Sequence, residues 1–199
     1  FGEEVIDTAG FKLPFSINLL LGQPEAFITF LVNVAGLLGG LYLWRKLKSQ
    51  GVQAMIIYLL LFLGLNVVVM TRDIFNLFVF LEISSVAIVG LVLLQRDVKA
   101  ISAGFKYLMA TGVISGLMLI GIIFVYQYAG SLYIADIVGA NVTAFKGGVV
   151  AVYFILIAIA LELKPFPANG WALDLYQGAH PGLAALVSAA FASAMVFVL

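Results

Sequence analysis

An acidic residue, Glu82, lies near the middle of a long apolar stretch that also holds Ser84 and Ser85. An ionised carboxylate in hydrocarbon costs at least about 2.5 kcal/mol, so this acid must be protonated, paired or next to water. Acids in that position usually belong to an ion or proton pathway. The alternative is a hydrogen-bonded structural acid inside a helix bundle. We take Glu82 as the first candidate pathway residue.

Two further charges, Glu162 and Lys164, end another apolar stretch. Residues two apart on a helix point to different faces, so we do not expect a simple ion pair between them. Pro165 and Pro167 follow, and proline removes backbone hydrogen bonds. A broken helix beside two charges is typical of transporter binding sites. The alternative is a helix that ends at the membrane interface.

Lys106 and His180 have more ordinary explanations. Lys106 is either a lysine that reaches the interface or a pathway residue, and Arg96 and Lys99 already supply interface charges before it. His180 precedes Pro181 at the start of the last span, and a single histidine near an interface is usually a cap or a surface residue, although its titration range suits a proton relay. The serines lack a histidine base and an acid in a hydrolase order, so an intramembrane serine hydrolase is a distant alternative.

The composition identifies the environment in which these residues lie. The chain has 199 residues, of which 64% are hydrophobic and 10% charged, and its mean hydropathy is +1.17. Soluble domains carry roughly 25% charged residues. The net charge of zero argues against a nucleic-acid partner. With no cysteine, one histidine and no cofactor motif, we predict neither a metal site nor a cofactor. An all-α polytopic membrane protein is the remaining class.

Apolar stretches of about 20 residues can cross a bilayer as helices. We predict about six transmembrane spans, one of them broken, with a preceding segment 1–25 outside the membrane. The chain begins at Phe1 without a signal peptide and reaches Leu199 inside an apolar stretch, so we expect a piece of a larger bundle. The predicted spans are 26–44, 54–70, 74–94, 107–128, 147–166 (broken) and 181–199.

Loop charges predict the orientation. Basic residues concentrate in the segments 45–53 and 95–104, whereas the segment before the first span is acidic. Cytoplasmic loops carry an excess of Lys and Arg. We therefore predict a multi-pass protein of the cell (or inner) membrane, with these two loops in the cytoplasm and the N-terminal segment outside.

Three segments resemble a known family. Residues 71–85, 102–108 and 171–179 are similar to parts of the antiporter-like subunits of respiratory complex I, Mrp-type sodium/proton antiporters and membrane-bound hydrogenases. The resemblance covers roughly residues 26–199 and would make the six spans family helices three to eight. It implies a proton-pumping module in which Glu82 matches a helix-five glutamate and Lys106 a lysine on helix six.

The resemblance has departures at the positions that matter for pumping. The family's helix-seven lysine position falls on Glu162, with Lys164 two residues later, and its following proline and histidine fall on Pro167 and Asn169. A short register shift would give Lys164 the lysine's role. The helix-eight positions that usually carry lysine or histidine fall on Ser188 and Ser193, which are candidate polar relay residues.

These patterns favour a membrane subunit, without redox chemistry of its own, that takes part in proton or Na⁺/H⁺ translocation. The resemblance implies that it works in a redox-driven complex or a multi-subunit antiporter, with other membrane subunits, lipid and H⁺ or Na⁺ as its partners. The alternative is a structural coupling subunit that does not conduct ions and bridges membrane arms. The retained Glu82 and Lys106 favour conduction, and the missing helix-eight lysine favours the structural subunit.

Overall fold

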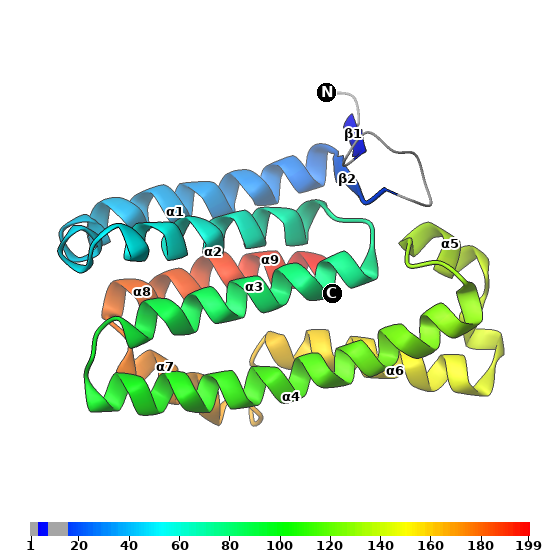
Figure 1. The fold of residues 1–199 in the computed structure, drawn as a ribbon. Coiled ribbons are helices and arrows are strands. Elements are labelled where there is room, and N and C mark those ends of the chain that lie inside the picture. The colour runs from blue at the N-terminus through cyan, green and yellow to red at the C-terminus, as the bar shows by residue number, and fades with distance from the viewer. Residues whose placement is uncertain (1–3, 8–15) are drawn as a thin grey trace.

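The computed structural model describes residues 4–7 and 16–199. Long helices lie side by side, with a small sheet at one end of the bundle (Figure 1). Much of the predicted N-terminal segment, residues 1–3 and 8–15, lies outside the described residues. The prediction of an all-α membrane bundle is confirmed, and two short strands add to it.

Among the described residues, five helices are long and apolar enough to cross a membrane. The fifth is continuous over α8, a π-helical turn at Val187–Phe191, and α9. The bounds are α1 Gln23–Gln50, α2 Val52–Met70, α3 Ile74–Leu93, α4 Val98–Ala129, α8 Pro181–Leu186 and α9 Ala192–Val198.

The predicted broken span, 147–166, covers α6 (Lys146–Glu162) and the start of the non-helical segment, and a second short helix, α7 (Gly170–Gly178), follows it. The 17 residues of α6 extend about 25 Å, which is less than the roughly 30 Å of a bilayer core. The count of six spans therefore stays a prediction. Both helices pack along the 32-residue α4 (Figure 1).

The break between α6 and α7 is confirmed, and its cause is visible in the backbone. Residues 163–169 are not helical. Lys164 has a left-handed backbone with φ of 58°, and the two prolines that follow have no amide hydrogen to donate. A helix that simply ended at the interface would not resume beside the same neighbour, so this is an interrupted helix.

The other helix ends follow from local sequence. The Asp73 side chain accepts a hydrogen bond from the Asn76 amide and begins α3, and Asp97 does the same for α4 through Lys99. Gly130, with φ of 69°, ends α4 in a left-handed cap. A short helix α5 (Ile134–Gly139) and a 3₁₀ turn (Val142–Ala144) then lead to α6.

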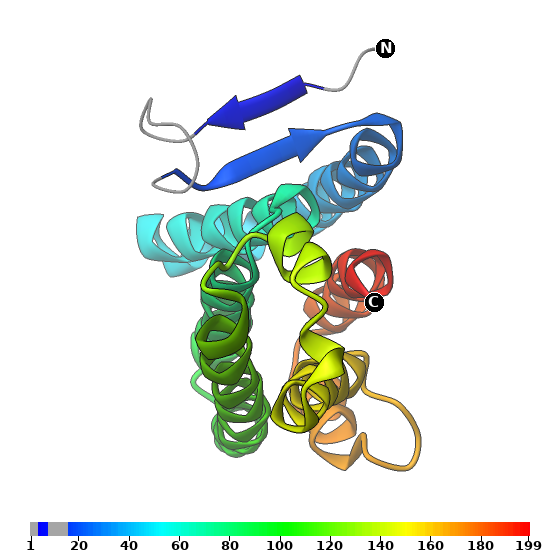
Figure 2. The same cartoon turned by 90° about the vertical axis from the view of Figure 1, so that its right-hand side faces the viewer.

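Close packing brings α4 and α6 together at Gly121. A Cβ atom at this position would lie 2.8 Å from the Ala151 carbonyl oxygen and 2.7 Å from Ile155 Cγ1. Small residues let helix backbones approach in this way inside membranes. The last helix closes the bundle, since α9 contacts α1, α2 and α6 (Figure 2). The last helix thus packs against α6, whose C-terminal end is the start of the break.

One end of the bundle carries the sheet. Strands β1 (Glu4–Asp7) and β2 (Asn18–Leu21) pair antiparallel, with Glu4 opposite Leu21. The buried Glu25 at the start of α1 pairs with Arg72 between α2 and α3. The α1–α2, α3–α4 and α7–α8 connections all lie at the opposite end (Figure 1).

Candidate functional site

Glu162, the last residue of α6, is a buried acid at the break. Its side chain is 6% exposed, and its Oε2 atom has no hydrogen-bond partner among the described residues. Buried carboxylates normally accept several hydrogen bonds or pair with a cation. This oxygen is therefore available to bind a proton or a water molecule.

The Lys164 ammonium lies among three aromatic rings. Its Nζ is 4.1 Å from the centroid of Phe191, 5.7 Å from that of Trp171 and 5.9 Å from that of Tyr107. The same Nζ donates to the Glu162 carbonyl oxygen at 3.1 Å. Aromatic faces attract a cation, most strongly where water is excluded. The rings therefore hold the ammonium, and no carboxylate of the described residues pairs with it.

The elements around this ammonium come from distant parts of the chain. Tyr107 belongs to α4, Trp171 begins α7, and Phe191 ends the π-helical turn near the middle of the last helix. Turns of the π type are frequent at functional sites. Sequence reasoning did not select these three residues, because aromatic side chains in an apolar chain are mostly packing residues.

Glu82 faces the same interior. It is half-buried on α3, and its carboxyl group interacts electrostatically with that of Glu162, as Lys164 also does. In the described part of the chain, none of these three groups forms an ion pair. The structure thus brings together two acids and one amine at the break, which we call the central charge cluster (Glu82, Glu162, Lys164).

Lys106 does not join this cluster. Its Nζ lies 2.6 Å from the Asp174 carboxylate on α7, and the two side chains are 57% and 41% exposed. The pair is on the outer face of α4 and α7. Asp174 was missed by sequence reasoning, although it is a charge in the otherwise uncharged segment 170–178.

The two candidate relay serines lie on the last helix. Ser193 donates to the Ala189 carbonyl oxygen at 2.7 Å, which is a bond within its own helix. Ser188 is exposed on the π-helical turn, three residues before Phe191. The structure places neither hydroxyl in hydrogen-bond contact with the central charge cluster, so their relay role stays a prediction.

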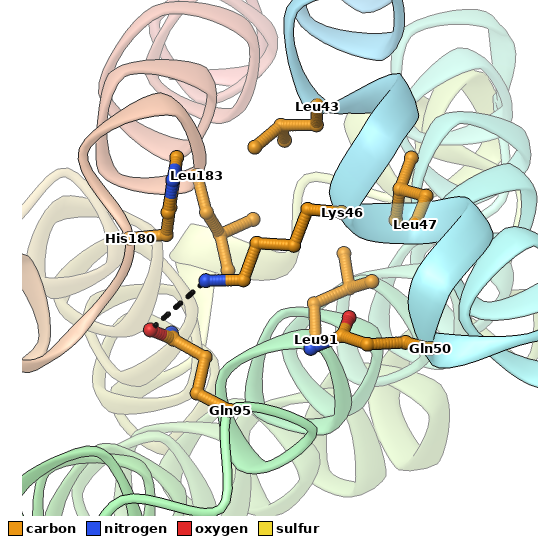
Figure 3. Close-up of a pocket in the computed structure, with 8 residues that line it drawn as sticks. All are labelled: Leu43, Lys46, Leu47, Gln50, Leu91, Gln95, His180 and Leu183. Atoms are coloured by element: carbon orange, nitrogen blue, oxygen red, sulfur yellow. Dashed lines mark hydrogen bonds between the residues drawn. The ribbon is translucent and has the colours of Figure 1, made fainter.

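His180 lies in the α7–α8 connection, at the end of the bundle opposite the sheet. Its Nδ1 accepts a hydrogen bond from the Gly182 amide at 3.2 Å and caps α8. The ring faces a small pocket that Lys46 and Gln95 also line, where Lys46 Nζ donates to Gln95 Oε1 at 3.5 Å (Figure 3). Burial and the nearby Lys46 charge lower the pKa of His180.

Fold and site together define a multi-pass helical membrane protein with an ionisable cluster at a broken helix. In the described residues, no group of three or more His, Asp or Glu side chains could hold a metal ion. The family described as NADH:quinone oxidoreductase/Mrp antiporter, transmembrane, matches residues 71–199. The chain belongs to this family, as the resemblance implied.

Individual relatives agree with this assignment. The chain is 30% identical over 197 residues to NADH-quinone oxidoreductase subunit N of Rhodospirillum rubrum, covering 96% of this chain and 38% of that protein. It is 27% identical over 192 residues to a subunit of the Na⁺/H⁺ antiporter of Bacillus subtilis, covering 94% and 39%. The chain thus spans about two fifths of the length of these relatives.

A solved structure shares the fold. A chain of the membrane-bound sulfane sulfur reductase, an archaeal respiratory membrane complex, superposes with a TM-score of 0.87 at 30% identity. The match covers 98% of this chain and 40% of that one. The two chains therefore share the arrangement of their helices over this length.

The His180 cap predicts a pH dependence of stability. The pKa of His180 is lower in the folded protein than in the unfolded chain, so the unfolded chain binds a proton on this ring more tightly. Folding stability is therefore lost as the pH falls from the unfolded-state pKa, about 6.5, through the folded-state pKa. His180→Asn keeps a capping side chain that does not titrate. We expect its thermal denaturation midpoint in detergent to fall less than that of the unmodified protein between pH 7.5 and pH 5.5. Parallel decreases in both proteins would contradict this role.

Proposed function

We propose that this chain forms part of an antiporter-like subunit that moves protons, or exchanges them for Na⁺, across the membrane. The observation that carries the proposal is the buried carboxyl group of Glu162, whose Oε2 has no hydrogen-bond partner among the described residues, in the residue whose backbone carbonyl oxygen accepts from the Lys164 ammonium at the helix break. Intramembrane ionisable residues commonly mark ion and proton pathways. Membership of the family supports the same function.

The arrangement suits stepwise transfer because each charge alters its neighbours. A proton that binds Glu162 removes the negative charge that stabilises the Lys164 ammonium, and it relieves the repulsion from Glu82. Coupled groups of this kind titrate as a unit. Proton arrival at one acid therefore favours departure from another member of the cluster.

The break gives Lys164 freedom that a helical lysine lacks. Its ammonium is held by aromatic faces and one carbonyl oxygen, so it can turn toward a carboxylate without breaking an ion pair. Non-helical backbone inside a membrane protein persists where it is buried or lines a wet cavity. In this proposal, Lys164 provides the lysine function of the helix-seven position that Glu162 occupies.

Replacing the acids tests conduction. We expect Glu82→Gln and Glu162→Gln, each in the intact complex reconstituted in liposomes, to lower proton translocation by roughly tenfold or more, because a positioned proton-transfer group contributes about 10²–10⁴-fold. Internal pH and ²²Na⁺ flux are measured together. Asp136→Asn, at an exposed position on α5, is the matched control and should translocate normally.

A structural coupling subunit is the second candidate function. The serines at positions 188 and 193 favour it, since neither can carry a positive charge through the second half of a pathway. If both Glu82→Gln and Glu162→Gln translocate protons at the unmodified rate, the proposed ion translocation is contradicted and the structural coupling role remains. Loss of complex assembly in those variants, without a specific loss of translocation in the assembled fraction, would support it further.

We also propose that the end of the bundle with the α1–α2 and α3–α4 connections faces the cytoplasm. The concentration of Arg and Lys there supports this orientation. Because the chain has no cysteine, single cysteines can report it.

A membrane-impermeant maleimide applied to intact cells should label Thr143→Cys and leave Ser49→Cys unlabelled, because the two exposed positions lie at opposite ends of the bundle. Both should react after the membrane is permeabilised, which controls for accessibility. The opposite labelling pattern would reverse the proposed orientation.

A further inference from the structure

A second unpartnered polar atom lies close to the central charge cluster. The Tyr107 side chain is fully buried, and its hydroxyl has no hydrogen-bond partner among the described residues. The hydroxyl interacts electrostatically with the Glu162 carboxyl group, whose Oε2 is unpartnered as well. Two buried polar atoms without partners in the described residues therefore come from the facing helices α4 and α6, close enough for their charges to interact.

Ser85 extends this region toward Glu82. Its hydroxyl lies near the Tyr107 hydroxyl without the geometry of a hydrogen bond, and the residue is 3% exposed. Three residues apart on α3, Ser85 and Glu82 are one turn from each other. Polar groups from three helices thus follow one another in the order Glu82, Ser85, Tyr107 and Glu162, of which Glu82 is half-buried and the other three are buried.

Buried polar groups in native proteins almost always have a hydrogen-bond partner, either protein or ordered water. Two neighbouring groups that lack a protein partner, one of them a hydroxyl that can both donate and accept, provide the contacts that a buried water molecule needs. In the described residues, neither group forms a hydrogen bond or an ion pair with Lys164 Nζ, which lies 5.9 Å from the centroid of the Tyr107 ring.

We propose that the Tyr107 hydroxyl and Glu162 Oε2 bind ordered water between them and that Tyr107 positions this water as the link between Glu82 and Glu162. This inference rests on the proposed function, because it names a residue of the same pathway. Tyr107 acts as a positioning residue, since its hydroxyl orients water and ends each transfer unchanged.

The transfer balances in protons. The Glu82 carboxyl group releases one proton and becomes a carboxylate. Each water oxygen between the two acids accepts one proton and donates another, and the Glu162 carboxylate gains the last one, while the Tyr107 hydroxyl holds the water in place. No group besides the two acids changes its charge, so the step needs no oxidant, reductant or co-reactant.

The substitution Tyr107→Phe removes the hydroxyl and keeps the aromatic ring, so it tests the hydroxyl alone. The variant keeps the aromatic face near Lys164 and its contact with the Trp171 ring, whose centroid lies 5.1 Å away, and it removes one oxygen atom. We expect proton translocation by the intact reconstituted complex to fall roughly tenfold, with a larger solvent isotope effect than in the unmodified complex. Tyr126→Phe, which removes an exposed hydroxyl from the same helix, should change neither quantity.

Each outcome has one meaning. If Glu82→Gln lowers translocation and Tyr107→Phe does not, the role of Tyr107 is contradicted while the proposed function stands. If neither Glu82→Gln nor Glu162→Gln lowers translocation, the proposed function itself fails. If the Tyr107→Phe complex does not assemble, a density map of the unmodified complex at a resolution that shows ordered water replaces this test. Water bonded to both Tyr107 and Glu162 would support the inference. A direct contact between the two side chains, or a third side chain between them, would overturn it.

Discussion

An ionisable side chain inside a hydrocarbon layer must lose its charge, gain a partner or reach water, and this constraint governs the interior of the bundle. Within residues 4–7 and 16–199, Glu162 is buried with an oxygen that has no hydrogen-bond partner, and Lys164 has aromatic faces in place of a carboxylate. Both lie where α6 gives way to non-helical backbone. Breaking the helix supplies free backbone groups, such as the Glu162 carbonyl oxygen, that stabilise a charge which an intact helix could not.

The rest of the fold holds this break in place. The long α4 packs along both halves of the interrupted helix, and the close approach at Gly121 sets its distance from α6. From the other side, the π-helical turn brings Phe191 against the Lys164 ammonium. The outward-facing pair of Lys106 and Asp174 joins α4 to α7 without entering the cluster.

Much of this could be predicted from the sequence, because apolar length and proline positions directly determine helices and breaks in a membrane. Glu82, Glu162 and Lys164 could be selected for the same reason, since charges are rare in apolar stretches. The partner of Lys106 and the three rings around Lys164 could not. They depend on which faces of α4, α7 and the last helix meet, and an aromatic residue in an apolar chain carries no signal of its contact. The side to which Lys106 points is likewise a property of packing.

The central claim is that Glu162 takes up and releases a proton while the complex works. Infrared difference spectroscopy of the intact complex during turnover measures this directly, because a protonated carboxyl group has its own C=O band. We predict a carboxylic-acid band that appears on turnover and is absent in Glu162→Gln. Identical difference spectra from the unmodified complex and from Glu162→Gln would contradict the account.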